Sequence, residues 1–367
     1  MRVSEEVPCG PGVSGSLPLE RIKADVDESL DLFMRAQTAK ATDACLLPVI
    51  EVIDGFLAGG KRVRPLFCVC GWVAAGGDAD AQPVREVGAA LELFHTFALI
   101  HDDVMDESAS RRGRPTVHRT FAERAGRGAA EPPEAERFGA AAAILVGDLC
   151  MVWSDELLHA SGLSPEQLHA ARPLIDAMRT EIMAGQYLDV DGDDENAADA
   201  LDRAWRVIRQ KTAGYTVTRP LQIGAALAGA DAALLDACAA YGDPLGEAFQ
   251  LRDDLLGVFG DPAVTGKSTK DDLRAGKRTV LTALTWQRAG ASQRTALRRL
   301  LGNDELDEDD ADQVRAIIRA TGADRSVEDM ITTRLARVFT ALDNAPMAES
   351  ARRTLAELAQ TAAYRQS

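Results

Sequence analysis

The chain is poor in aromatic residues, and this limits the folds that it can form. Phe, Trp and Tyr together make up 5% of the 367 residues. Much of the apolar content is instead Ala, Leu and Val, arranged in long stretches that contain little proline. Such stretches favour helices over strands. We therefore expect an all-α fold.

Paired cysteines, long apolar runs and an excess of positive charge are also missing. The six cysteines include no CxxC pair and no histidine at zinc-site spacing, which predicts reduced thiols in a cytoplasmic protein. The longest apolar runs, such as residues 140–146, are too short or too glycine-rich to span a bilayer, and we see no signal peptide. With a net charge of -16, the chain is expected neither to bind nucleic acid nor to be an integral membrane protein.

The sequence predicts one large domain after a short flexible start. Residues 1–18 contain prolines and glycines without helical periodicity, whereas apolar residues at helical spacing begin at Leu19. The breaks at 76–78, 126–133 and 191–195 do not have the composition of interdomain linkers. We therefore expect a single domain over 19–367. Its helices are expected at 44–57, 64–75, 83–106, 136–160, 166–189, 197–228, 232–259 and 278–287.

Three aspartates follow an apolar stretch in the segment LIHDDVMDESASRRGRPTVH, residues 99–118. On a helix, Asp102 and Asp106 stand four positions apart and Asp103 and Asp106 three, so their carboxylates lie along one edge. Like charges without partners would repel one another there, whereas hard divalent cations prefer such oxygen ligands. The segment therefore predicts a divalent-metal site.

A second acidic pair, Asp253 and Asp254, follows another apolar helical stretch, and Asp261 lies two turns beyond Asp253. Two acidic helix edges that face each other can hold Mg²⁺ ions that chelate a diphosphate. Several basic residues stand out in this acidic chain: Lys61, Arg62, Arg64, Arg111, Arg112, Lys211, Lys267 and Lys277. Because Arg and Lys both bind phosphate oxygens, we expect two diphosphates, one held through Mg²⁺ and the other directly by cations.

In these segments the chain resembles the trans-isoprenyl diphosphate synthases, or polyprenyl synthetases, from about Leu19 to the C-terminal region. The shared motifs, in order, are GGKRxRP at 59–65, His95 ahead of HDDxxDxxxxRRGxPT at 101–116, GQxxD at 185–189, KT at 211–212, FQxxDD at 249–254 and TGK at 265–267. The resemblance implies an isoprenoid synthase-type helical bundle around a central cavity. It also implies a trans-prenyltransferase that condenses an allylic diphosphate (dimethylallyl, geranyl or farnesyl) with isopentenyl diphosphate.

The resemblance also implies roles for individual residues. The implied metal ligands, for about three Mg²⁺ ions per active site, are Asp102, Asp106, Asp189 and Asp253. Asp103 and Asp254 support them, and the catalytic group also includes Arg111, Lys211 and Thr212. The cations Arg111, Lys211, Lys267 and Lys277 match substrate-binding positions, the first three for the allylic diphosphate. The implied isopentenyl site consists of Lys61, Arg64, His95 and Arg112. Gln186, Asp189, Thr212 and Gln250 match positions near the developing carbocation, where oxygen dipoles stabilise positive charge.

The sequence departs from the family pattern at Gly257, where a third Asp often completes the second acidic motif. We expect water to replace the missing acceptor and the enzyme to remain active. This departure also leaves Asp261 without an assigned role.

Three residues before the first acidic motif resemble the positions that set product length: Phe94, Phe97 and Ala98. Phe97 stands on nearly the same face as the acids, about 7 Å deeper at 1.5 Å per residue, and can act as the floor of the pocket. A small Ala98 beside it favours geranylgeranyl diphosphate over farnesyl diphosphate as the product. Ordinary core packing of Phe97 is the alternative interpretation.

Two other functions remain open at this point. A class I terpene cyclase shares the fold and an acidic motif but needs no isopentenyl site, and a noncatalytic regulatory subunit would have lost acidic ligands or cations. The intact motifs favour chain elongation over both. Family members pair through helices that precede the active site, so the resemblance also implies a homodimer.

Overall fold

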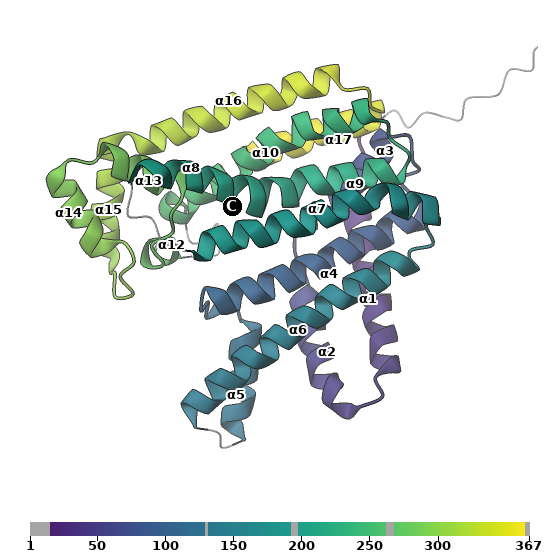
Figure 1. The fold of residues 1–367 in the computed structure, drawn as a ribbon, viewed down its shortest axis with the longest axis horizontal. Coiled ribbons are helices and arrows are strands. Elements are labelled where there is room, and N and C mark those ends of the chain that lie inside the picture. The colour runs from purple at the N-terminus through teal and green to yellow at the C-terminus, as the bar shows by residue number, and fades with distance from the viewer. Residues whose placement is uncertain (1–14, 129–130, 192–196, 262–267, 364–367) are drawn as a thin grey trace, which may run out of the picture.

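The protein is described here by a computed structural model that covers residues 15–128, 131–191, 197–261 and 268–363. Figure 1 shows long helices packed side by side, with a cluster of shorter helices at one end. The all-α prediction is confirmed, because the described strands are only β1 (Ser110–Arg111) and β2 (Arg114–Pro115), which form a small antiparallel pair.

The helices of the first half are α1 (Leu19–Lys40), α2 (Leu47–Leu57), α3 (Val63–Ala74), α4 (Gln82–Met105), α5 (Val117–Arg127), α6 (Pro132–Ala160) and α7 (Pro165–Val190), with the 3₁₀ turn η1 (Ala44–Leu46) ahead of α2. Those of the second half are α8 (Ala197–Val207), the π-helix η2 (Ile208–Thr218), α9 (Arg219–Leu227), α10 (Ala232–Phe259), α12 (Asp271–Arg274), α13 (Val280–Arg288), α14 (Ala291–Leu300), α15 (Glu308–Thr321), α16 (Ala323–Asn344) and α17 (Glu349–Ala363).

Local sequence signals explain where several helices begin. Ser164 and Gln167 form a reciprocal capping box at the start of α7, with Pro165 at its first position. Asp231 caps α10 by accepting a hydrogen bond from the backbone N–H of Leu234 at 2.9 Å. These caps satisfy backbone donors that have no partner within the helix.

Two hydrophobic clusters hold the bundle together. The larger one joins α1–α4, α6, α7, α9, the first part of α10 and the ends of α16 and α17. The smaller one joins the last part of α10 to α8 and α12–α16. Helix α12 packs on α10, and Figure 1 shows α12 on the same side of the view as one end of α4 and one end of α7. The last turns of α4 and α10 therefore end near the junction of the two clusters, which positions their acidic residues.

The structure differs from the expected helices in two places. The single helix expected at 197–228 consists of α8, η2 and α9, because the middle segment follows a π-helical path. The helix α5 lies in a segment for which we expected no helix, and it packs on α6 through Val117 and Phe121. Its apolar residues are too few to have marked it as a helix with a buried face.

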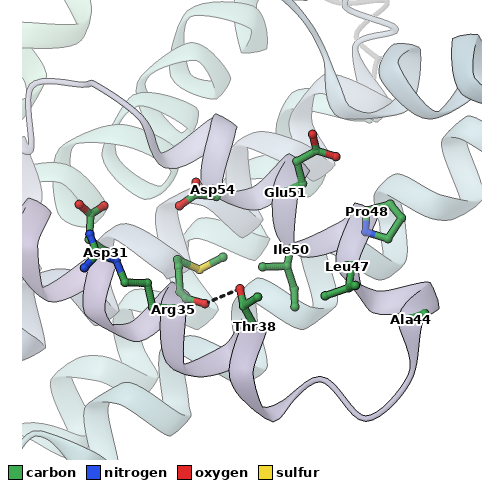
Figure 2. Close-up of a pocket in the computed structure, with 10 residues that line it drawn as sticks. Asp31, Arg35, Thr38, Ala44, Leu47, Pro48, Ile50, Glu51 and Asp54 are labelled. Carbon is green, nitrogen blue, oxygen red and sulfur yellow. Dashed lines mark hydrogen bonds between the residues drawn. The ribbon is translucent and has the colours of Figure 1, made fainter.

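A groove of about 720 Å³ lies between α1 and α2, and Figure 2 shows the residues that line it. Asp31, Glu51 and Asp54 line it, and Arg35 is the only basic residue among its lining residues. A diphosphate carries strong negative charge, so these carboxylates would repel it. The groove is therefore not a candidate for the predicted chemistry.

Helix α6 is long and apolar enough to cross a membrane by length and composition, although only 39% of its most apolar window is buried. It packs along α4 and α5, and its outer side carries exposed apolar residues such as Leu145 and Val152. Asp148 stands between them with 51% of its side chain exposed. A carboxylate in the middle of this face argues against contact with lipid.

Candidate active site

The first acidic cluster lies at the C-terminal end of α4, where the chain turns into β1. Asp103 is fully buried and accepts a fork of hydrogen bonds from Arg111, at 2.6 to 2.9 Å. Asp102 and Asp106 lie nearer the surface, and Arg111 Nη2 is 3.6 Å from Asp102 Oδ2. Asp103 therefore anchors Arg111, while Asp102 and Asp106 are accessible for ligands.

Lys211 connects this cluster to α7. Its Nζ donates to Asp102 Oδ1 at 2.9 Å and to Asp189 Oδ2 at 2.6 Å. Burial favours the neutral amine, but the two carboxylates outweigh it and raise the pKa of Lys211. Conversely, burial would raise the pKa of Asp102, and Lys211 and Arg111 lower it below its usual value. The lysine thus holds Asp102 in its charged form.

The π-helix η2 brings Lys211 and Thr212 into this position. Its backbone runs close to α7 and α10, where Gly185 and Gly246 stand. A Cβ on Gly185 would lie 2.5 Å from the backbone N of Lys211, and one on Gly246 would overlap Ala213. Because π-turns are rare and often mark functional sites, the glycines and this turn together indicate that the position of Lys211 matters.

The second acidic cluster lies on the last turns of α10. Asp254 is buried, and its Oδ1 accepts a hydrogen bond from Gln250 Nε2 at 2.8 Å. The Oε1 of Gln250 accepts from the Thr212 hydroxyl at 2.9 Å, which links this cluster to η2. Burial raises the pKa of Asp254 to about 7. Asp253, next to it, is only half-buried, so the two carboxylates differ in their access to solvent.

A lysine also interacts with the second acidic cluster. Lys277 Nζ lies 3.3 Å from Asp272 Oδ1. Burial lowers the pKa of Lys277, but Asp272 and Asp106 outweigh it and raise the pKa. Lys277 thereby interacts with both clusters, since Asp106 belongs to the first. The charge of Lys277 also acts on Asp254, so both acidic clusters lie within electrostatic reach of this lysine.

A carboxylate lies at the place beside Gly257 where we expected water. A Cβ on Gly257 would overlap Asp272 Oδ2, so the carboxylate of Asp272 fills this place. Sequence reasoning missed Asp272 because it lies on α12, outside the second motif. Asp261 is exposed beyond the end of α10.

The four residues expected at the isopentenyl site come from the loop before α3, from α3 and α4, and from β1–β2. Arg64 stacks over the Tyr215 ring at 4.1 Å and donates to the Thr216 hydroxyl at 2.9 Å. His95 Nδ1 lies 3.1 Å from the Tyr215 hydroxyl. Burial, followed by the charge of Arg64, holds the pKa of His95 well below its usual value. Tyr215 was missed because an isolated Tyr carries no motif.

A hollow of about 470 Å³ lies beside these residues and includes Gly59, Gly60 and Arg112 among its lining. Gly60 has a positive φ of 109°, and a Cβ there would lie 3.2 Å from Arg112 Nη1. Lys61 is exposed at this edge. Arg62, by contrast, is buried and pairs with Asp27 and Glu92 inside the protein, so it stabilises the loop from within.

The remaining predicted residues are placed as follows. Gln186 is half-buried and donates to Met105 Sδ at 3.4 Å. Phe94 and Phe97 are buried and Ala98 is half-buried. The Phe97 ring lies 4.8 Å from the ring of His101, whose Nε2 lies 3.0 Å from the carbonyl oxygen of Ile144 on α6. Lys267 lies outside the described residues.

Comparison with known proteins shows the family to which this chain belongs. The polyprenyl synthetase family model matches residues 49–318. The chain belongs to the polyprenyl synthetase family. It is 35% identical to the geranylfarnesyl diphosphate synthase of Aeropyrum pernix, over 72% of this chain and 77% of that protein. It is 33% identical to a (2E,6E)-farnesyl diphosphate synthase of Mycobacterium tuberculosis, over 72% and 68%. The predicted family and the predicted class of enzyme, a trans-prenyl diphosphate synthase, are therefore confirmed.

A solved structure of this family supports the same conclusion. The crystal structure of geranylgeranyl pyrophosphate synthase from Corynebacterium glutamicum, complexed with isoprenyl diphosphate and magnesium, matches with a TM-score of 0.89 and 39% identity. The match covers 95% of this chain and 100% of that one. The isoprenoid synthase fold that the sequence implied is thus confirmed.

The donor set of this polyprenyl synthetase fits Mg²⁺ that is shared with a substrate. Among the described residues, no three His, Cys, Asp or Glu side chains lie close enough to hold a metal ion by themselves. Mg²⁺ usually binds one or two carboxylates and completes its shell with water and substrate phosphates. The buried Asp254 Oδ2 lacks a hydrogen-bond partner, as expected for an acceptor that is satisfied only when ligands are bound.

Proposed function

We propose that the chain condenses isopentenyl diphosphate with allylic diphosphates in a Mg²⁺-dependent reaction whose main product is geranylgeranyl diphosphate. One observation carries this proposal: Lys211 pairs with Asp102 of the first acidic cluster, Lys277 acts on Asp106 of the first cluster and on Asp254 of the second, and a separate basic group surrounds Arg64. The first arrangement suits a metal-bound diphosphate. The second suits a diphosphate bound directly by cations.

The allylic diphosphate binds between the two acidic clusters. Asp102 and Asp106 on α4 would hold metal ions, Asp253 on α10 would hold another, and Asp189 assists through Lys211. Arg111 uses Nε and Nη2 for Asp103, and we assign its Nη1 to the diphosphate. Bound Mg²⁺ supplies Lewis-acid stabilisation of the leaving diphosphate. The number of ions is about three, as the family resemblance implies.

Isopentenyl diphosphate binds to Lys61, Arg64, His95 and Arg112. Tyr215 orients this site, since its ring supports Arg64 and its hydroxyl contacts His95. The neutral imidazole can then present Nε2 as a donor to a phosphate oxygen. Arg112 lies close to Gly60, where the small residue leaves room for its guanidinium group.

These positions define the reaction step. The allylic C–O bond breaks, and the diphosphate leaves with the electron pair while Lys211 and Arg111 stabilise its growing charge. The double bond of isopentenyl diphosphate attacks the allylic cation, and the departed diphosphate accepts the proton whose loss forms the new double bond. Thr212 and Gln250 direct oxygen dipoles toward this region, joined by their 2.9 Å hydrogen bond.

The length of the product is proposed from α4. The buried Phe97 closes the space below the acids, and the smaller Ala98 leaves it deeper than two large side chains would. The relatives named above are synthases of farnesyl, geranylgeranyl and geranylfarnesyl diphosphates, so neighbouring product lengths occur among similar proteins. Geranylgeranyl diphosphate has the intermediate chain length of these three products.

Product analysis tests the proposal. Purified protein is incubated with Mg²⁺, isopentenyl diphosphate and geranyl or farnesyl diphosphate, and the dephosphorylated products are separated by chromatography. We expect geranylgeraniol as the main alcohol. With geranyl diphosphate as the primer, farnesol alone would correct the product length, whereas a hydrocarbon formed from geranylgeranyl diphosphate alone would indicate a terpene cyclase. No turnover by the purified chain would favour the regulatory subunit.

We also propose that the enzyme is a cytoplasmic homodimer. Leu145 and Val152 on α6 are 69% and 57% exposed, and Phe138 on the same helix is 52% exposed. A second copy would cover this apolar face. The buried, reduced cysteines Cys68, Cys70, Cys150 and Cys238 are consistent with a reducing compartment.

A further inference from the structure

The carboxylate of Asp272 takes up the space next to Gly257. Position 257 is one helical turn after Asp253, where a third acidic residue would complete the motif. The overlap of a Gly257 Cβ is with Asp272 Oδ2 first, then with the Asp272 Cγ at 3.1 Å. Any side chain at 257 and the carboxylate of Asp272 would therefore compete for the same place.

Asp272 is also coupled to its charged neighbours. It lies on α12, which packs on α10, and its side chain is 31% exposed. Its charge adds to burial in raising the pKa of Asp254, ahead of the charge of Asp253. Asp272 therefore lies within the electrostatic reach of the second acidic cluster.

Lys277 completes the arrangement. It pairs with Asp272 at 3.3 Å, and Asp106 also acts on it across the site. The unpartnered Oδ2 of the buried Asp254 lies in the same cluster. Removing the carboxylate at 272 would leave Lys277 without its nearest anion and the cluster with one acceptor fewer.

We propose that Asp272 replaces the missing third aspartate of the second acidic motif, and so helps to position the metal ion and Lys277 opposite Asp253. The proposal rests on the proposed Mg²⁺-dependent function. It assigns a positioning role, in which Asp272 acts through the metal's surroundings and through Lys277. The motif is thus completed by a different segment of the chain.

Binding of Mg²⁺ and inorganic diphosphate tests this role without turnover. Titration calorimetry measures the Mg²⁺ concentration at which inorganic diphosphate half-saturates the full chain. We expect D272N to raise this concentration about 10- to 100-fold, the usual effect of losing a residue that orients metal ligands. The matched control is D271N, which removes the same charge from the neighbouring, exposed position of α12. It should change the value less than about twofold.

A rescue experiment separates positioning from simple structural support. In G257D the new side chain clashes with Asp272, so we expect weaker binding and a lower unfolding temperature. In the double variant G257D/D272A the new carboxylate can enter the vacated space, so binding should be at least about fivefold tighter than in D272A. Circular dichroism on each variant reports whether the fold is retained.

The outcomes are distinct. Equal binding by D272N and D271N overturns the inference. A double variant that binds no more tightly than D272A overturns it as well, because the carboxylate then cannot be exchanged between positions 257 and 272. Either result leaves the proposed function intact if the wild-type chain still binds Mg²⁺ with diphosphate and forms product. A wild-type chain that does neither would overturn the proposed function itself.

Discussion

Asp102 has two cationic partners: Lys211 within the protein and, as proposed, a metal ion that binds with the substrate. We expect D102N to reduce kcat by about 100-fold or more, because it removes a ligand next to developing charge. The fold should persist, since Lys211 keeps its 2.6 Å contact with Asp189. Steady-state kinetics and thermal unfolding measure both effects. D176N on the exposed side of α7 is the control, and equal kcat values in the two variants would contradict the proposed role.

His95 makes the stability of the fold depend on pH. Burial and the charge of Arg64 keep its pKa well below 6.5 in the folded protein, whereas the unfolded chain binds a proton near pH 6.5. Because the unfolded state binds more protons below that pH, the free energy of unfolding falls as pH decreases. The loss grows as the pH falls further below 6.5.

Urea unfolding at pH 7.5 and 5.5 measures this contribution. The decrease in the free energy of unfolding should be larger for wild type than for H95Q, which has no titrating ring. Other groups titrate in the same range and contribute to both proteins, so the difference between the two decreases isolates His95. If H95Q loses as much as wild type, His95 is protonated in the folded state.

Some site residues could be identified from the sequence and others could not, because only the first group belongs to local motifs. Asp102, Lys211 and Asp254 belong to local motifs whose residue types match the chemistry, and the structure brings them together. Tyr215 and Asp272 act through contacts with segments far away in the chain, which no local spacing records. The family resemblance assigned Arg64 and not Arg62 of GGKRVRP to the isopentenyl site, and the fold adds a physical reason, because Arg62 is buried.

At the scale of elements, the π-helix η2 makes a prediction about packing. G246A should destabilise the protein by about 1 to 3 kcal/mol, because its Cβ would overlap Ala213 and displace η2. It should also lower kcat, since Lys211 moves with that helix. G126A on α5 has open space around the new Cβ and is the control. Denaturant unfolding and steady-state kinetics measure both effects. Equal free energies of unfolding and equal kcat values in the two variants would contradict the packing role.

Helix α4 connects product length to the acidic end. F97A should lengthen the product by opening the floor of the pocket, whereas A98F should shorten it. Chromatography of the dephosphorylated products measures both shifts. If neither variant changes the product, Phe97 is core packing against Phe94 and His101, and another helix sets the length.

The helices themselves were largely predictable because long apolar periodicities mark α4, α6, α7 and α10. The π-helical path of 208–218 was not, since its apolar pattern continues that of the flanking α-helices, and the extra residue in each turn is compatible with the same sequence. The close approach that selects it comes from Gly185 and Gly246 on other helices. Tertiary packing therefore decided a local conformation.

At the scale of the whole molecule, the exposed face of α6 predicts the assembly. Light scattering at micromolar concentration should give twice the mass of one chain. The variant L145E/V152E places charge on that face and should give single chains. K23E on α1 is a charge-changing control that should leave the dimer intact. A monomeric wild type, or an unchanged dimer in the double variant, would exclude this face as the interface.

The lysines between the acidic clusters have a thermodynamic consequence for the order in which ligands assemble. Lys211 already neutralises Asp102 and Asp189, and Lys277 acts on Asp272 and Asp106. Free Mg²⁺ must compete with these ammonium groups, while a diphosphate attracts them toward its own oxygens. Diphosphate thus draws the lysines away from the carboxylates that bind Mg²⁺, and Mg²⁺ frees the lysines to bind diphosphate. By reciprocity, Mg²⁺ must tighten diphosphate binding by the same factor as diphosphate tightens Mg²⁺ binding. Metal and substrate would then enter together, and the carboxylates would not draw Mg²⁺ from the cell while no substrate is present.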